Sequence, residues 1–270
     1  MNILLTNDDG IYADGIAAIY TALKQAGHDV TVVAPSSERS AVGHAITVSD
    51  PLKVSWIDVE PRISGYAVEG TPADCVKIAV NALLDTLPDL VISGINKGAN
   101  TGNHIIYSGT VSAATEATMF GLPALAVSLD VIFRNQERYD FSYAAAFAVR
   151  LCANLTQHPP LPAGTFLNVN IPGIPPRQIK GIRMTKQARF QHTDEYEKRT
   201  DPFNRTYYWL RFEKVIVQDA PDVDVDYRLL KEGYIVMTPL HYDLTDYEML
   251  AHLQEWYGEE EKKGGNAFFS

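Results

Sequence analysis

Two adjacent carboxylates, Asp8 and Asp9, follow a short apolar run and precede a glycine in the segment Asn7-Asp8-Asp9-Gly10. Neighbouring carboxylates repel each other unless a positive group joins them, and hard divalent cations such as Mg²⁺ and Mn²⁺ prefer oxygen ligands. The alternative is an Asx-type turn that leads into the next helix. This tetrapeptide alone does not favour the cation, so the choice depends on what other segments bring to it.

Polar side chains also follow later apolar runs. Ser40 lies in the hydroxyl-rich segment 35–44, and Asn96 lies in 93–100, where an amide offers a neutral oxygen to a cation. The segment 107–111 places hydroxyls before a predicted helix, where free N–H groups and the helix dipole favour an anion. Taken singly, each segment is equally compatible with a polar loop, a Gly/Asn turn or a helix cap.

The elements that must position these residues alternate along the chain. An apolar run at 2–6, helical spacing at 15–25 and a second apolar run at 29–34 form a βαβ unit. We predict further helices at 72–87, 110–120 and 141–155, and further strands at 90–93, 123–129 and 165–171. The fold class is therefore α/β: a three-layer, doubly wound, mostly parallel sheet of Rossmann-like type over residues 1–176. Its polar segments meet at one edge of the sheet, because ligands bind beyond the carboxyl ends of such strands.

Residues 177–270 have a different pattern. Alternating, aromatic-rich segments such as 206–212 predict antiparallel strands or hairpin arms. A strand follows at 234–237, helical spacing returns at 246–256, and the charged residues after 258 are typical of a solvated tail. We predict a C-terminal extension with β-hairpin arms and a terminal helix that serves oligomerisation; the alternative is a compact C-terminal subdomain.

Composition excludes some partners. The net charge of −10 disfavours a nucleic acid duplex, although a bound cation can reverse the local field for a small phosphorylated ligand. Cys75 and Cys152 are typical of buried thiols in a reducing compartment. We find neither a signal-peptide pattern nor an apolar segment of ~20 residues, so we expect a cytoplasmic protein with no membrane partner.

Five segments together resemble successive motifs of the survival protein E (SurE) family. They occur in the family's order and roughly its spacing, and the resemblance is strong up to about Pro172 and weaker beyond. The segments are Asn7-Asp8-Asp9-Gly10, Arg39-Ser40-Ala41-Val42-Gly43-His44, Gly70-Thr71-Pro72-Ala73-Asp74-Cys75-Val76, Ser93-Gly94-Ile95-Asn96-Lys97-Gly98-Ala99-Asn100 and Tyr107-Ser108-Gly109-Thr110-Val111.

The resemblance implies a metal-dependent 5′/3′-nucleotidase, a phosphatase that releases phosphate from nucleoside 5′- and 3′-monophosphates, with some activity on short polyphosphate. It implies one divalent cation per subunit, Mg²⁺ or Mn²⁺, with Asp8 and Asp9 as the catalytic pair. The implied metal ligands are Asp8, Asp9, Ser40 and Asn96, and the implied phosphate-binding residues are Asn100, Ser108, Gly109 and Thr110. It further implies a homodimer or a tetramer in which the C-terminal arms exchange between subunits.

Some roles stay open at this point. Asp8 is either a metal ligand alone or a ligand that also transfers a proton. Direct attack of water on the phosphate is favoured over an aspartyl-phosphate intermediate, because both carboxylates serve as ligands. His104 lies where many family members carry an acidic residue, and it is a local acid or a surface residue. His44 fits a loop-orienting donor better than a proton shuttle, and Tyr107 and Phe190 are candidates to stack on a base.

Two other classes of function compete with this one. A nucleotide-binding module without hydrolysis shares the sheet and the phosphate turn but does not need the paired carboxylates. An NAD-type dehydrogenase is disfavoured because no Gly-x-Gly-x-x-Gly follows the first strand, and Asp8 and Asp9 would repel a pyrophosphate in the absence of a metal.

Overall fold

The protein is described by a computed structural model that covers residues 1–59, 62–131, 139–155 and 161–262. Within these residues a nine-stranded sheet forms the centre, and two further strands form a separate ribbon. In spatial order the sheet contains β3 (Val54–Val59), β4 (Ile63–Val68), β2 (Asp29–Pro35), β1 (Asn2–Thr6), β5 (Leu90–Lys97), β6 (Ala124–Asp130), β7 (Thr165–Pro172), β11 (Ile235–His241) and β8 (Ile182–Met184).

The middle of the sheet is parallel. From β4 through β2, β1, β5 and β6 to β7 every neighbouring pair runs in the same direction, whereas β3 and β11 join antiparallel to β4 and β7. Leu4 and Leu5 are fully buried on opposite faces of β1, as expected of a strand covered on both sides. The predicted mostly parallel, doubly wound sheet is confirmed.

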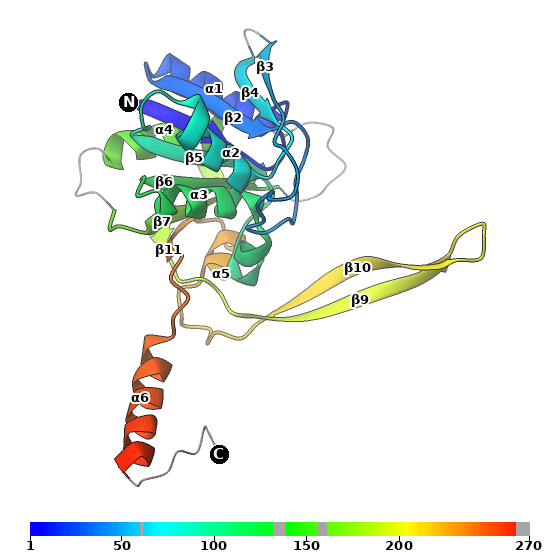
Figure 1. Cartoon of the computed structure of the whole chain (residues 1–270), viewed down its shortest axis with the longest axis vertical. Coiled ribbons are helices and arrows are strands. Elements are labelled where there is room, and N and C mark those ends of the chain that lie inside the picture. Colours follow the sequence, from blue (N-terminus) through cyan, green and yellow to red (C-terminus); the bar gives the residue numbers. More distant parts are fainter. Residues whose placement is uncertain (60–61, 132–138, 156–160, 263–270) are drawn as a thin grey trace.

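Helices cover both faces of this sheet (Figure 1). Ile3 and Leu5 belong to the core that contains side chains of α1 (Asp14–Gln25) and α4 (Ser142–Leu155). Leu4 belongs to the core that contains side chains of α2 (Pro72–Ile78) and α3 (Gly109–Met119). The alternation of neighbouring side chains along β1 therefore produces the three layers.

The helix predicted at 72–87 is too long. The α-helix α2 ends at Ile78, one π-helical turn (Ala79–Leu83) follows, and Leu84 is already extended. Leu87 precedes Pro88, and a residue before proline disfavours the helical conformation, so a helix that reaches Leu87 is disfavoured. Sequence analysis also missed the β3–β4 hairpin and ended β5 at residue 93, four residues before its end at Lys97.

The C-terminal region contains the predicted arm and helix. Strands β9 (Phe190–Thr200) and β10 (Thr206–Val217) form an antiparallel ribbon that projects from the α/β body, and helix α6 (Tyr247–Lys262) extends separately (Figure 1). Helix α5 (Asp226–Lys231) lies between them in sequence. The division near residue 176 stays a prediction, although β8 and β11 beyond it join the sheet. Among the described helices, none has the length and apolar character that a membrane span requires.

Candidate metal and phosphate site

The predicted site residues gather at the carboxyl edge of β1, β2 and β5. These strands are parallel neighbours, so the chain leaves all three at the same edge. A cavity of about 620 Å³ lies there, and the predicted residues in its lining are Asp8, Ser40, Asn96, Asn100 and Ser108. Asp9 lines an adjoining cavity of about 200 Å³ instead, and Lys97 lines both. Gly109 and Thr110 are not in the lining, but both lie against Asp8.

Asp8 is a buried carboxylate with one strong neutral donor. Its side chain is only 5% exposed, and the Thr110 hydroxyl donates a hydrogen bond of 2.5 Å to its Oδ1. Burial raises the pKa of Asp8 to about 6, against the lowering effect of the Thr110 hydrogen bond, and the charge of Asp9 raises it further. Burial therefore disfavours the charged form of Asp8 more than the Thr110 hydrogen bond favours it.

The pKa of Asp9 is also raised by burial above the ordinary value, and the charge of Glu38 adds to the rise. The backbone N–H of Lys97, with a hydrogen bond of 2.9 Å, and the charge of the Lys97 side chain oppose it. The Lys97 ammonium lies over the Tyr139 ring, 5.1 Å from its centroid. Two carboxylates with raised pKa values at one edge are the arrangement that a bound cation would stabilise.

The donor set fits a hard cation. Among the described residues, no three side chains of His, Cys, Asp or Glu cluster as metal ligands, so an ion here also needs hydroxyl, amide or water oxygens. Mg²⁺ accepts such mixed oxygen ligands and usually keeps several waters. Asp8, Asp9, Ser40 and Asn96 offer two carboxylates, a hydroxyl and an amide.

Asn96 presents its amide oxygen because its amide nitrogen is occupied. Nδ2 of Asn96 donates to the Gly98 carbonyl at 2.8 Å, which leaves Oδ1 for a ligand. The pairing of β5 with β6 shifts register between Gly94 and Asn96, and a bulge of this kind re-aims the side chain that follows it. The periodicity of a short apolar run does not reveal such a shift.

The loop that carries Ser40 is fastened directly to the other site segments. The N–H of Arg39 donates to the Asp8 carbonyl at 2.7 Å, and the N–H of Gly43 donates to the Tyr107 carbonyl at 2.9 Å. The Ser40 hydroxyl donates to Oε1 of Glu38 at 2.6 Å, so its oxygen lone pairs remain for a cation.

The buried carboxylate of Glu116 holds the same loop. Glu116 on α3 contacts His44 Nε2 at 2.7 Å and Lys77 Nζ at 3.0 Å. Burial raises the pKa of Glu116, but these two contacts outweigh burial and hold it below the ordinary value. His44 therefore has the loop-orienting contact that sequence analysis favoured over a proton shuttle.

The start of α3 supplies the anion side of the cavity. Ser108 is the N-cap, and its oxygen accepts the N–H of Val111 at 3.1 Å, which leaves the hydroxyl proton for a ligand. The first-turn N–H groups of Gly109 and Thr110 have no carbonyl partner within the helix. The Thr110 hydroxyl is occupied by Asp8, so Thr110 can contact an anion only through its backbone.

Gly109 is required by its contact with Asp8. A Cβ at residue 109 would lie 2.8 Å from the Asp8 Cβ and 3.1 Å from the Pro72 Cγ. The glycine thus lets the helix start approach the carboxylate, and any side chain there would displace Asp8.

Asn100 is fixed by four hydrogen bonds from β6 and β7. Its N–H donates to Asn170 Oδ1 at 2.8 Å, and its carbonyl accepts from Asn168 and Asn170 at 2.8 and 3.0 Å. Its Nδ2 donates to the Ser128 hydroxyl at 2.9 Å. Because a serine hydroxyl donates as well as accepts, the opposite amide orientation satisfies the same contact and directs the nitrogen toward an anion.

Three cavity residues come from the arm, and sequence analysis missed them. They are Asp194, Tyr196 and Leu210. No local pattern reveals them, since only the folded arrangement of ribbon and body brings them to the cavity.

His104 and Tyr107 also line the cavity, whereas Phe190 does not. Burial lowers the pKa of His104, and the charge of Asp226 opposes the shift. Phe190 is buried, with its ring 5.4 Å from the His104 ring and 5.0 Å from the Tyr227 ring. Of the two base-stacking candidates, only Tyr107 is therefore placed to contact a ligand.

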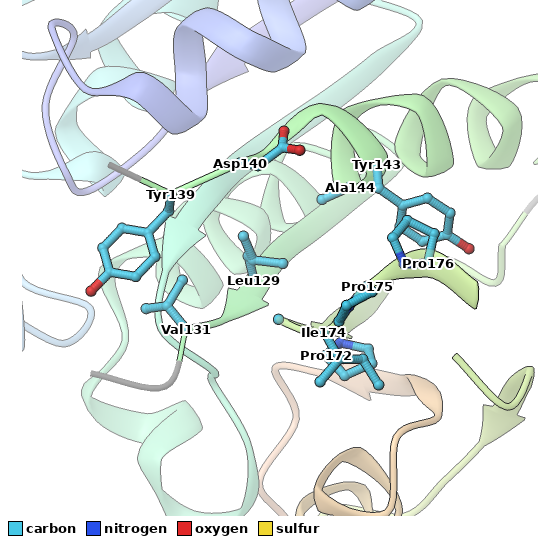
Figure 2. A pocket seen from close by; sticks show the side chains of 11 residues that line it. Leu129, Val131, Tyr139, Asp140, Tyr143, Ala144, Pro172, Ile174, Pro175 and Pro176 are labelled. Carbon is cyan, nitrogen blue, oxygen red and sulfur yellow. The ribbon is translucent and has the colours of Figure 1, made fainter. Parts of the chain in front are cut away.

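A second cavity, of about 390 Å³, lies beyond the carboxyl ends of β6 and β7 (Figure 2). Its described lining is mostly apolar, with Tyr139 on one side and Tyr143 beside Pro176 on the other (Figure 2). Asp140 is the one charged residue in that lining. The paired carboxylates and the helix start lie elsewhere, so this cavity is not the candidate site.

The fold and site define a doubly wound α/β protein with a candidate cation and anion site at the carboxyl ends of its parallel strands. A family profile described as "Survival protein SurE" matches residues 3–194. The chain belongs to the SurE family, as the five sequence segments predicted.

Individual relatives support the same membership. The chain is 48% identical over 256 residues to "5′-nucleotidase SurE" of Syntrophobacter fumaroxidans, covering 95% of this chain and 99% of that protein. It is 49% identical over 259 residues to the protein of the same name from Nitratidesulfovibrio vulgaris, covering 96% and 93%. The crystal structure of the SurE protein from Aquifex aeolicus superposes with a TM-score of 0.78 at 37% identity, covering 95% of this chain and 100% of that one.

Proposed function

We propose that this protein is a divalent-metal-dependent nucleotidase that hydrolyses nucleoside 5′- and 3′-monophosphates to nucleoside and phosphate. One observation carries the proposal: the buried carboxylate Asp8 lies against the N-terminus of α3, where an anion would bind. An anion beside carboxylates is unfavourable unless a cation lies between them. The relatives named 5′-nucleotidase support the reaction class.

In this proposal Asp8, Asp9, Ser40 and Asn96 hold one Mg²⁺ or Mn²⁺ per subunit. When bound, such a cation neutralises phosphoryl charge and lowers the pKa of water. Thr110 fixes the orientation of Asp8 through its hydroxyl.

The remaining phosphoryl oxygens are held by the α3 side of the cavity. Ser108 donates its hydroxyl proton, Asn100 its amide nitrogen, and Gly109 and Thr110 their backbone N–H groups. Phosphoryl transfer depends mainly on positioning and charge neutralisation, and rigid donors of this kind supply both. Direct hydrolysis is favoured over an aspartyl-phosphate, because Asp8 is already engaged by Thr110 and the proposed cation.

The test is a phosphate-release panel on the full chain. Nucleoside 5′- and 3′-monophosphates, sugar phosphates and short polyphosphate are compared with Mg²⁺, with Mn²⁺ and with EDTA. We expect cation-dependent release that is fastest from nucleoside monophosphates. Tight binding of AMP without any release would favour the nucleotide-binding module, and release that persists in EDTA would contradict the metal role.

The proposal extends to assembly and location. The arm and α6 expose large apolar side chains, including Trp209, Leu253 and Trp256, and two copies of the chain can bury them in a homodimer or a tetramer with exchanged arms. Cys75 and Cys152 are both free and buried, which supports the reducing cytoplasm as the compartment.

A further inference from the structure

The arm contributes one wall of the cavity at the candidate site. Asp194 and Tyr196 of β9 and Leu210 of β10 line it, together with Asp8, Asn96 and Ser108 of the body. The anion end of the cavity thus has a second wall built from a different part of the chain.

These three arm residues share one face of the ribbon, which we call the arm face. Tyr196 pairs directly with Leu210 across the two strands, and Asp194 is two residues from Tyr196, so their side chains point to the same side. The pairing shifts register between Leu210 and Phe212. A bulge at this point bends the ribbon and increases its twist, and thereby determines which residues lie against the cavity.

The arm face adds apolar surface to a cavity that is otherwise largely polar. Tyr196 is 60% exposed and Leu210 is 54% exposed, so an apolar pair remains open beside a polar pocket. Asp194 adds a carboxylate next to that pair. A phosphate ion fills only a small part of a cavity of about 620 Å³, which is the size of sites that bind whole small molecules.

We propose that the arm face binds the nucleoside part of the substrate, with Tyr196 and Leu210 against the base and Asp194 accepting hydrogen bonds from the ribose hydroxyls. Every base has a flat apolar face that stacks on an aromatic ring without sequence preference. A carboxylate is the usual partner of ribose hydroxyls in nucleotide sites. This inference rests on the proposed function and makes the arm, rather than the α/β body, the part that selects nucleotides over other phosphate esters.

The first experiment compares Tyr196→Ala with Tyr208→Ala. Tyr208 is on the same face, two residues before Leu210 in β10, is 59% exposed and does not line the cavity, so it is a matched control for loss of an exposed aromatic ring. We expect Tyr196→Ala to lower kcat/KM for AMP by about 10-fold through KM, because one base–aromatic contact is lost. The same change should alter hydrolysis of glycerol 2-phosphate, which has no base, by less than about twofold, and Tyr208→Ala should alter neither.

The second experiment tests the carboxylate. We expect Asp194→Ala to reduce the preference for AMP over 2′-deoxy-AMP, because the group that accepts the ribose hydroxyl hydrogen bonds is gone. Glu195→Ala is the control, since its side chain points to the other face of the ribbon. An unchanged preference in Asp194→Ala would remove the ribose contact from the proposal.

AMP binding, measured by calorimetry with Mg²⁺ present, separates failure of this inference from failure of the proposed function. If no substrate releases phosphate but AMP binds about 10-fold more weakly to Tyr196→Ala than to Tyr208→Ala, the nucleotidase proposal fails and the arm face stands. If AMP binding and turnover are the same in both variants, the arm face is wrong whatever the reaction. Equal losses for AMP and glycerol 2-phosphate would also overturn it, because they would indicate a general disturbance of the site.

Discussion

The candidate site buries a charged group, whereas the C-terminal extension exposes apolar groups. At the site a carboxylate is buried, with Asp8 only 5% exposed and its pKa raised. In the extension, defined as the arm β9–β10 together with α6, apolar rings are open, with Trp209 58% and Trp256 50% exposed. Burial raises the pKa of the site carboxylates, and the extension exposes large apolar side chains, so we expect each region to be completed by something that binds to it: a cation at the site and a second copy of the chain at the extension.

The largest effect should come from Asp8→Asn. We expect a loss of more than ~100-fold in phosphate release, because the amide cannot replace a charged ligand, while the Thr110 hydroxyl can still donate to the amide oxygen. The melting temperature should stay the same or rise, since a buried charge is removed. Asp222→Asn, at an exposed position, is the control, and activity near the wild-type level in Asp8→Asn would contradict the cation role.

Removal of α6 tests whether the C-terminal extension binds a second copy of the chain. A chain that ends at residue 245 lacks the apolar side chains of α6, and we expect it to form a smaller assembly than the full chain. Light scattering measures the mass. An unchanged dimer would reject α6 as part of the interface and would favour a compact C-terminal subdomain.

A glycine-to-alanine substitution in each region should distinguish them by a smaller effect on activity. Gly109→Ala should lower activity by ~10- to 100-fold, because the new Cβ displaces Asp8, and displacement of a reacting group by about 1 Å is costly. Gly258→Ala in α6 meets no atom within 4 Å and should leave activity unchanged. Steady-state kinetics of both variants with AMP measure the contrast, and equal activities would indicate that the α3 start tolerates a side chain.

The smallest effect concerns Asp74, which helps to hold the Ser40 loop. Burial raises its pKa, but hydrogen bonds from Thr47 and Thr71 outweigh burial and hold it below the ordinary value of 3.8. The carboxylate therefore stabilises the folded state above pH 3.8, and this contribution is lost as the pH falls through the lowered pKa.

We expect Asp74→Asn to lower the free energy of unfolding by about 1–3 kcal/mol at pH 7, because an amide nitrogen replaces one acceptor. The difference from wild type should shrink as the pH falls below 3.8. Denaturant unfolding at several pH values measures it. A difference that stays constant with pH would show that the charge of Asp74 is not what stabilises the loop.

Much of the body could be predicted because its signals are local. The apolar runs that became β1 and β2, and the helical spacing that became α1, depend on residues a few positions apart. The five family-like segments are also local, and they identified the residues around the cavity before their positions were known. The bulge after Gly94 and the early end of α2 were missed, and the bulge depends on strand pairing, which the periodicity of a single segment does not reveal.

The sequence by itself determined the α/β class, the family and the residue types of the candidate site, since each is encoded in short stretches of the chain. Only the tertiary structure decided which residues share a cavity: Asp9 lines the adjoining one, Thr110 serves Asp8, Phe190 packs inside, and the arm supplies Asp194, Tyr196 and Leu210. These relations join residues up to 202 positions apart, from Asp8 to Leu210. The packing of strands and ribbon brings them together, and no local pattern carries that information.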